Sequence, residues 1–186
     1  MNIRPYIYEC LEEAQKNFQI IVFTASHQAY ADAILDHIDP ENHYFQYRLY
    51  RHNCVQTKEG YYVKDLRIFR NCDLRDLVIV DNSVFSFAYQ IDNGIPIIPF
   101  YADKEDEEML HLVYYLKCLT QVPDVRQQNK EAFELAKLQS LSPLEIITNY
   151  YNNNHQQQML LQATDELDGR EDVILEENEE THEYQS

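Results

Sequence analysis

The chain has 186 residues, which is long enough for one domain with a sizeable hydrophobic core. Its formal net charge is −17, and the segment from Asp165 to Glu183, with ten acidic residues and one arginine, accounts for −9 of it. The remaining acidic excess argues against a dedicated nucleic-acid-binding protein, because phosphate backbones are bound by clustered lysine and arginine side chains.

Cysteine usage and apolar runs favour an intracellular protein, nuclear or cytoplasmic. The four cysteines lie far apart, and none has the spacing of a zinc ligand or of a Cys-x-x-Cys pair, which is typical of reduced thiols. The first residues lack the apolar core of a signal peptide, and no run approaches the roughly 20 apolar residues that span a bilayer. We therefore expect a soluble chain without a membrane segment.

The first predicted elements are a helix, a strand and a second helix. Pro5 suits a first helical turn, and apolar residues at helical spacing predict an amphipathic helix over residues 5–16. Residues 20–24, IIVFT, predict a buried parallel strand, because the run is short, β-branched and apolar on both faces. Ser26 is expected to cap a following helix whose apolar face extends to Ile38.

The second half of the folded region continues the alternation. Residues 43–66 predict a hairpin that turns near Gly60, with YFQYRLY and GYYVKDL as its arms. Residues 77–80, LVIV, predict a second buried strand, and residues 95–100, IPIIPF, a third extended segment at a sheet edge because of its prolines. Apolar spacing from 109 to 119 predicts another helix. The alternation indicates an open α/β sheet, whose sites lie outside the carboxyl ends of the strands.

The C-terminal part has a different composition. Residues 148–186 are rich in asparagine and glutamine and then in acidic residues, so they cannot bury enough apolar surface to offset the entropy of ordering. We predict a folded domain over residues 1–140 and a disordered tail over residues 148–186.

Polar residues at predicted strand ends are the candidates for chemistry: Thr24, Lys64 just after the hairpin, and Asp81 with Asn82. Each has an ordinary explanation on its own, as a turn residue or a solvated edge charge. Together they suit a phosphoryl-transfer site. A hydroxyl can bind a phosphoryl oxygen, an ammonium can neutralise its charge, and a carboxylate with an amide can help to hold Mg²⁺.

Several segments together resemble one family of phosphatases. In chain order they are RPYIYECLEEAQKNFQIIVFTAS, YADAILDHID, YRHNC, YYVKDL, LVIVDNS and DNGIPI, within about residues 4–125. This set is similar to the small CTD phosphatase domain, also called NLI-interacting-factor-like and including dullard-type phosphatases, of the haloacid dehalogenase (HAD) superfamily. The resemblance implies a HAD-like Rossmannoid fold with three layers, a parallel sheet and a β-hairpin insertion.

The resemblance also implies residue roles. Thr24 would be the hydroxyl of the family's second motif and Lys64 the lysine of the third. Asp81 and Asn82 would be the acidic and metal-binding pair of the fourth, with Mg²⁺ as the cofactor. Arg51 falls where the family has an arginine that contacts the phosphorylated residue, although it is equally well explained as a solvent-facing cation of the hairpin.

The chain departs from the family at its start. The family nucleophile belongs to an Asp-x-Asp-x-Thr motif on a strand before the Arg-Pro helix, and no Asp-x-Asp occurs in the 186 residues. The first aspartate attacks phosphorus and the second is the general acid and base. We therefore expect the chain as given to be inactive, with Mg²⁺ binding weakened or lost.

The same departure affects the expected fold. The absent strand would be central, between residues 20–24 and 77–80, and its absence would leave unpaired edges. Each buried unpaired backbone group costs on the order of 1–3 kcal/mol, which predicts poor stability or aggregation. A smaller departure is Val84, where the family usually has proline, and we expect it to change loop stiffness more than chemistry.

Three interpretations remain open. The chain is part of a magnesium-dependent phosphoserine/phosphothreonine protein phosphatase with its first strand upstream, a noncatalytic pseudophosphatase that binds phosphoproteins or a phosphatase partner, or a gene fragment. Expected partners are phosphorylated proteins or peptides, with no direct contact to nucleic acid. A two-component receiver domain is set aside because its phosphorylated Asp precedes the Thr and Lys, whereas Asp81 follows both.

Overall fold

The structure is a computed structural model that describes residues 2–135 and 137. The described strands form three pairs. Two pairs are parallel and one is an antiparallel hairpin: β1 (Ile21–Phe23) with β2 (Tyr47–Leu49), β5 (Ile79–Asp81) with β6 (Gly94–Pro96), and β3 (Val55–Gln56) with β4 (Tyr62–Val63).

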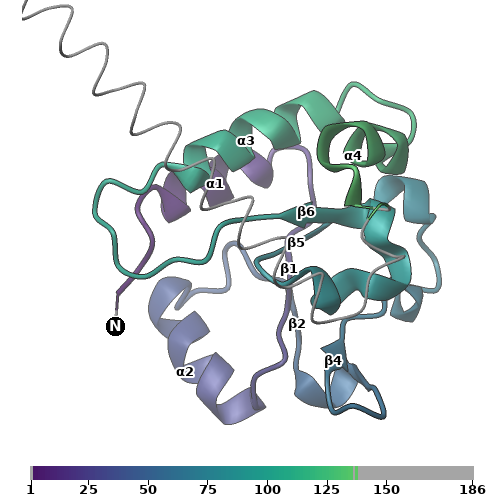
Figure 1. Cartoon of the computed structure of the whole chain (residues 1–186). Coiled ribbons are helices and arrows are strands. Elements are labelled where there is room, and N and C mark those ends of the chain that lie inside the picture. The colour runs from purple at the N-terminus through teal and green to yellow at the C-terminus, as the bar shows by residue number, and fades with distance from the viewer. Residues whose placement is uncertain (1, 136, 138–186) are drawn as a thin grey trace, which may run out of the picture. The chain divides into compact units, whose positions relative to one another are not determined.

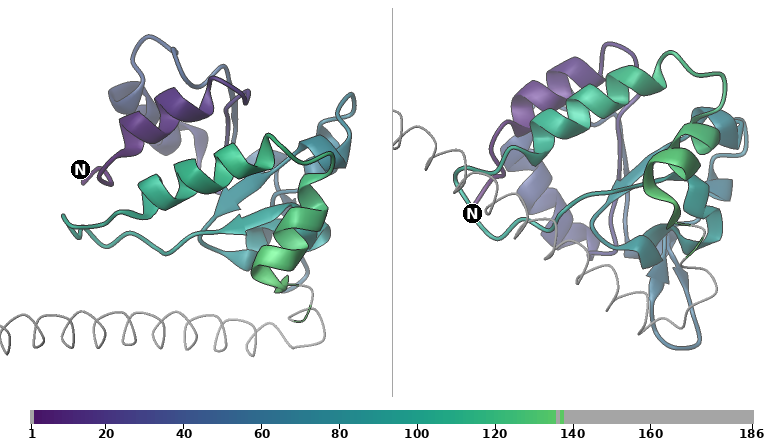
Figure 2. Two further views of the ribbon diagram at one scale, coloured as in Figure 1. Left: turned by 90° about the horizontal axis from the view of Figure 1, so that it is seen from above. Right: turned by 45° about the horizontal axis from the view of Figure 1, so that its top comes forward.

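Helices surround these strands. The α-helices are α1 (Ile7–Ala14), α2 (Gln28–Ile38), α3 (Glu108–Leu119) and α4 (Val125–Phe133). The 3-10 helices are η1 (Arg51–Asn53), η2 (Leu66–Ile68), η3 (Leu74–Asp76) and η4 (Val84–Asn93). Helices α1 and α3 lie side by side on one side of the parallel strands, and α2 lies on the other (Figures 1 and 2). This is the layered α/β arrangement that the sequence predicts.

Most predicted elements are confirmed, with two corrections. The arm YFQYRLY was expected to pair with the other half of the hairpin, but its central residues form β2 and pair in parallel with β1. The hairpin is instead β3 and β4, and its turn does contain Gly60, at φ 92°. The second correction concerns Ser26, because α2 has His27 rather than Ser26 at its N-cap.

The two parallel pairs are separate ladders. Within the described residues, no backbone ladder joins β1–β2 to β5–β6, so each strand of these two pairs has a strand partner on one side only. Such an edge offers unpaired N–H and C=O groups to another strand. The predicted tail, residues 148–186, lies outside the described residues, so the predicted domain boundaries stay a prediction.

Two hydrophobic clusters flank the strands, and α1 contributes to both. Cys10 belongs to the cluster that α3 forms with Ile95 of β6. Leu11, the next residue, belongs to the cluster that α2 forms with Phe45 and Tyr50 near β2. Because successive helical positions point about 100° apart, one helix can serve two cores. This packing fixes the positions of the carboxyl ends of the strands.

The loop before β2 is organised by one buried carboxylate. Asp39 follows α2 and accepts hydrogen bonds from the backbone N–H groups of His43, Tyr44 and Phe45, at 2.7, 2.8 and 2.9 Å. Burial alone would raise the pKa of this carboxyl, but the three N–H donors outweigh burial and lower the pKa below its ordinary value of 3.8. The ionised form of Asp39 therefore stabilises the fold.

We expect Asp39→Asn to lower the free energy of unfolding by roughly 2 kcal/mol at pH 7, because an amide offers one acceptor oxygen to three buried donors. A carboxyl with a lowered pKa contributes stability above its unfolded pKa and loses it as pH falls. The difference between the two proteins should therefore shrink as pH falls below 3.8, measured by urea denaturation from pH 7 to pH 3. Glu41→Gln, on an exposed neighbour, is the control. A pH-independent difference would contradict this explanation.

Candidate active site

Thr24 directly follows β1 at the carboxyl end of the strand. Its backbone N–H donates to the carbonyl of Leu49 at 2.9 Å, which extends the ladder with β2 by one bond. Its hydroxyl Oγ1 accepts a hydrogen bond from the backbone N–H of Ser26 at 3.1 Å. This side-chain turn holds the tight loop between β1 and α2. The hydroxyl is thus fixed at the edge where the sheet architecture predicts a site.

Lys64 and Asp81 form a buried ion pair at the same edge. Lys64 follows β4, Asp81 ends β5, and the Lys64 ammonium donates to Oδ2 of Asp81. Each residue is 8% exposed. The other carboxylate oxygen, Oδ1, accepts from the backbone N–H of Ser83 at 2.8 Å, and the Lys64 N–H donates to the carbonyl of Ser86 at 2.6 Å. The pair joins the hairpin to the β5 end.

Arg51, the first residue of η1, is held against the loop that follows Thr24. Its Nε donates to the carbonyl of Ala25 at 2.6 Å, and its Nη1 lies 2.8 Å from Nε2 of His27. Its guanidinium carbon lies 4.9 Å from the ring centroid of Tyr62 on β4, a cation–π contact. Arg51 is thus half-buried and held by three contacts, of which the one with His27 is exposed to solvent, and its role in binding stays a prediction.

Cys54 lies beside the Thr24 carbonyl and near the charges of the candidate site. Its Sγ lies 3.8 Å from the carbonyl oxygen of Thr24. Burial raises the pKa of the thiol, the positive charges of Lys64 and Arg51 oppose that rise without reversing it, and Asp81 adds to it. The Cys54 thiol is therefore close enough to Lys64, Arg51 and Asp81 for their charges to affect its pKa.

Asn82 is the exception among the predicted residues. It is exposed, one position beyond Asp81. In the part of the chain that the structure describes, no hydrogen bond joins Asn82 or the Thr24 side chain to Lys64 or Asp81. The structure therefore brings Lys64 and Asp81 into contact, places Arg51 on the Thr24 loop, and leaves Asn82 at the rim.

A metal ion would find a partial set of ligands here. The Asp81 carboxylate and the Asn82 side-chain carbonyl are the hard oxygen donors that Mg²⁺ prefers. Among the described residues no group of three or more His, Cys, Asp or Glu side chains could hold a metal, and Lys64 already engages one oxygen of Asp81. Asp81 and Asn82 fit as part of a magnesium site, with further ligands required.

Sequence reasoning missed His27, Tyr62 and Cys54. Tyr62 lies in the segment YYVKDL and Cys54 ends the segment YRHNC, while His27 stands directly after the Thr24-Ala25-Ser26 turn. These positions gave no role, because each residue matters through a contact with a residue distant in the sequence.

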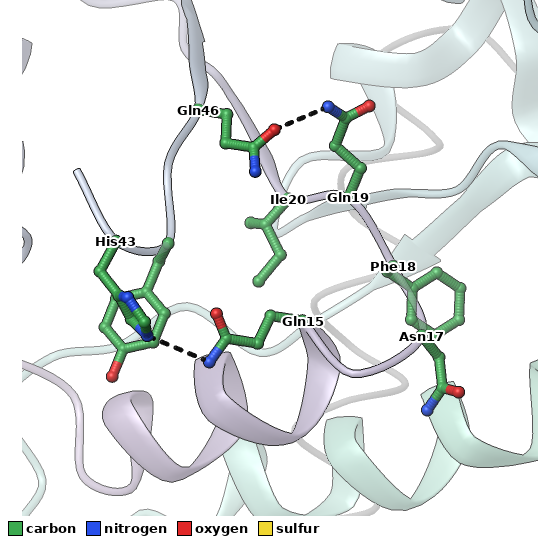
Figure 3. A pocket seen from close by; sticks show the side chains of 8 residues that line it. Gln15, Asn17, Phe18, Gln19, Ile20, His43 and Gln46 are labelled. Carbon is green, nitrogen blue, oxygen red and sulfur yellow. Dashed lines mark hydrogen bonds between the residues drawn. The ribbon is translucent and has the colours of Figure 1, made fainter.

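A separate hollow of about 340 Å³ lies at the opposite, amino ends of β1 and β2. Figure 3 shows the amides of Gln19 and Gln46 facing one another, 2.9 Å apart, and Gln15 directed toward His43. Its lining residues are Gln15, Asn17, Phe18, Gln19, Ile20, His43, Tyr44 and Gln46. It contains no predicted site residue.

Comparison with known proteins identifies the family. The model of the NLI interacting factor-like phosphatase family matches residues 1–126. The chain belongs to this family. Membership of the NLI interacting factor-like phosphatase family confirms the resemblance noted in the sequence and, with the parallel strands observed here, the HAD-like α/β fold class.

Curated relatives carry related names. CTD small phosphatase-like protein 2 of Dictyostelium discoideum is 45% identical over 137 residues, covering 74% of this chain and 24% of the relative. CTD small phosphatase-like protein 3 of Caenorhabditis elegans is 40% identical over 136 residues, covering 73% and 47%. The chain thus spans about a quarter of the length of the first relative and just under half of the second.

Solved structures give a looser match. The structure of Fcp1, an essential RNA polymerase II CTD phosphatase, has 23% sequence identity and a TM-score of 0.47, covering 68% of this chain and 37% of that one.

None of the helices in the described residues combines the length and apolar character needed to cross a bilayer.

Proposed function

We propose that this chain carries the phosphate-binding part of a magnesium-dependent phosphoserine/phosphothreonine protein phosphatase site. The observation that supports it best is the buried Lys64–Asp81 ion pair at the carboxyl edge of the strands, with Arg51 anchored nearby. A buried ammonium and a guanidinium can stabilise the negative charge of a transferring phosphoryl group. The Thr24 hydroxyl would bind a phosphoryl oxygen, and Arg51 would bind the phosphorylated residue.

The nucleophile would come from an Asp-x-Asp-x-Thr strand between β1 and β5, whose facing edges lack strand partners in the described residues. The first aspartate would attack phosphorus and break the bond to the serine or threonine oxygen, forming an aspartyl-phosphate. The second would give a proton to the leaving oxygen and then take one from the water that hydrolyses the intermediate. Asp81 and Asn82 would help to hold Mg²⁺, which supplies charge neutralisation at the phosphoryl oxygens.

The proposed substrates are phosphorylated proteins or peptides, and the proposed location is nuclear or cytoplasmic. Relatives of the chain include CTD nuclear envelope phosphatase 1 of Xenopus tropicalis, 35% identical over 123 residues. A phosphatase regulatory partner is a further proposal, which the acidic composition of residues 165–183 supports through attraction to a basic surface.

The test compares two polypeptides: this chain, and this chain preceded by a strand ending in Asp-x-Asp-x-Thr. With Mg²⁺ and a phosphoserine peptide, we expect phosphate release from the second only, and loss of that release by at least 100-fold when its first aspartate becomes Asn. Turnover by the 186-residue chain alone, abolished by Asp81→Ala, would contradict the proposed nucleophile. The N-terminal sequence of the endogenous protein shows whether such a strand occurs naturally.

A noncatalytic role is the second candidate, in which Thr24, Arg51 and Lys64 would bind a phosphorylated residue without a nucleophile to attack it. In that case the endogenous protein would carry no Asp-x-Asp-x-Thr strand and would bind a phosphopeptide without releasing phosphate. The same two measurements therefore separate the two functions.

A further inference from the structure

The contact between His27 and Arg51 joins the start of α2 to the candidate site. Nε2 of His27 lies 2.8 Å from Nη1 of Arg51. A guanidinium only donates hydrogen bonds, so Nε2 must accept this one. The geometry therefore requires a neutral His27 that carries its proton on Nδ1.

Helix capping does not explain the position of the His27 side chain. His27 occupies the N-cap of α2, but it makes no side-chain bond to the helix amides. No acidic residue lies in the first turn of α2, so no carboxylate of that turn competes for the imidazole. The next carboxylate along the helix, Asp32, is engaged by Arg48 at 3.2 Å and by the hydroxyl of Tyr50 at 2.6 Å.

The contacts of Arg51 leave one direction open. Nε is bound to Ala25, Nη1 to His27, and one face of the guanidinium lies on Tyr62. Among the described residues, Nη2 has no hydrogen-bond partner. Because a guanidinium is planar and rigid, fixing Nε and Nη1 also fixes the direction of Nη2.

We propose that His27 is a positioning residue, which holds the Arg51 guanidinium so that Nη2 faces the phosphate and which releases it when the imidazole is protonated. The proposal rests on the proposed function of Arg51 as a phosphate ligand. It adds that pH controls the orientation of Arg51 through His27, a residue that would not itself contact the substrate.

Protonation removes the contact for two reasons. An imidazolium has no acceptor nitrogen, and its charge repels the guanidinium. The charged and titratable groups near Arg51 are the Tyr62 phenol beneath it on β4, the Cys54 thiol after η1, and the Lys64–Asp81 pair. The Lys64 ammonium already engages the Asp81 carboxylate, and among the described residues Nη1 makes no hydrogen bond besides the one to His27.

The first experiment tests the contact without any ligand. Long-range ¹H–¹⁵N NMR spectra distinguish the two neutral imidazole tautomers, and the His27 signals are those lost in His27→Gln. We expect the Nδ1–H tautomer in the wild-type chain at pH 8, and a shift toward Nε2–H in Arg51→Ala. An Nε2–H tautomer in the wild-type chain would overturn the proposal and leave the function of Arg51 untouched.

The second experiment measures sulfate affinity by NMR titration at pH 8 and pH 5.5, because sulfate keeps its double negative charge over this range. Imidazoles gain a proton between about pH 5 and 8. We expect roughly three- to tenfold weaker binding at pH 5.5 in the wild-type chain. His27→Gln, whose side-chain carbonyl accepts at any pH, should bind like wild type at pH 8 and lose this dependence. His27→Ala should bind weakly at both values.

The outcomes separate the two claims. If Arg51→Ala leaves sulfate affinity unchanged, both the proposed function of Arg51 and the role of His27 fail. If Arg51→Ala weakens binding but the wild type and His27→Gln share one pH profile, Arg51 remains a phosphate ligand and the role of His27 is overturned.

Discussion

Lys64→Ala is expected to lower the free energy of unfolding by about 3–5 kcal/mol. The substitution leaves the Asp81 carboxylate, 8% exposed, without the ammonium that compensates its charge. The Asp81 carboxylate would keep one hydrogen bond among the described residues, from the backbone N–H of Ser83. Urea denaturation at pH 7, followed by circular dichroism, measures the loss.

Two further variants make that result specific. In the double variant Lys64→Met/Asp81→Leu no charge stays buried, so we expect a smaller loss than in Lys64→Ala. Arg75→Ala is the matched surface control, because its ion pair with Asp73 is more than half exposed on both sides, and it should change stability little. If Lys64→Ala and the double variant lower the free energy of unfolding equally, packing rather than charge compensation is what stabilises the contact between Lys64 and Asp81.

Gly94→Ala is expected to be as damaging, for a steric reason. A Cβ on Gly94, the first residue of β6, would lie 2.6 Å from Cζ of Phe87 and nearer still to two other ring atoms. Phe87 is 0% exposed, so its ring has no free space to enter. Overpacking typically costs about 1–3 kcal/mol, and we expect a value near 3 kcal/mol here because the ring cannot move aside. Thermal and urea denaturation both give the measurement.

The ring itself supplies the control for Gly94. Phe87→Leu removes the atoms that the new methyl group would overlap, so Gly94→Ala should cost clearly less in the Phe87→Leu background than alone. Gly60→Ala tests the contrasting case, because a Cβ there meets nothing within 4 Å and only the φ of 92° is unfavourable. Additive losses at Gly94 and Phe87 would rule out the steric explanation.

The spacing of apolar residues along the sequence correctly predicted several helices and strands. β1, β5, α1 and α3 carry apolar spacing that fits only one secondary structure, and all four were found. β2 was misassigned because the alternating aromatics of residues 44–50 fit a hairpin arm as well as a parallel strand. Its partner β1 lies more than 20 residues away, and the sequence of a strand does not indicate which distant strand it pairs with.

Helix α4 was not predicted because its residues are mostly polar. Its segment, VRQQNKEAF, buries only Val125 and Asn129, so it shows little apolar periodicity. A signal was present at its start, where Asp124 accepts a hydrogen bond from the backbone N–H of Arg126 at 3.0 Å. Pro-Asp followed by a helix-forming run is a typical N-cap pattern.

The candidate site was only partly predictable. Strand-end positions selected Thr24, Lys64, Asp81 and Asn82, and motif resemblance added Arg51. The structure brings Lys64 and Asp81 into contact and holds Arg51 on the loop after Thr24, while the catalytic and binding roles stay predictions. The contacts that orient them could not be inferred, because each depends on three-dimensional proximity. His27 and Arg51 are 24 positions apart, and the Asp39 carboxylate acts through backbone groups that carry no sequence signature.

The shared helix α1 has a consequence for how the fold responds to heat and denaturant. Cys10 and Leu11 commit it to different cores, and no backbone ladder joins the two parallel pairs in the described residues. The β1–β2 half and the β5–β6 half therefore unfold together because their side chains pack against α1, and not because a backbone ladder links them. Packing contacts of this kind are lost when the packed groups move a short distance apart. In this chain, all-or-none unfolding therefore depends on the packing of one eight-residue helix, together with the Lys64 contacts that join the hairpin to β5 and η4.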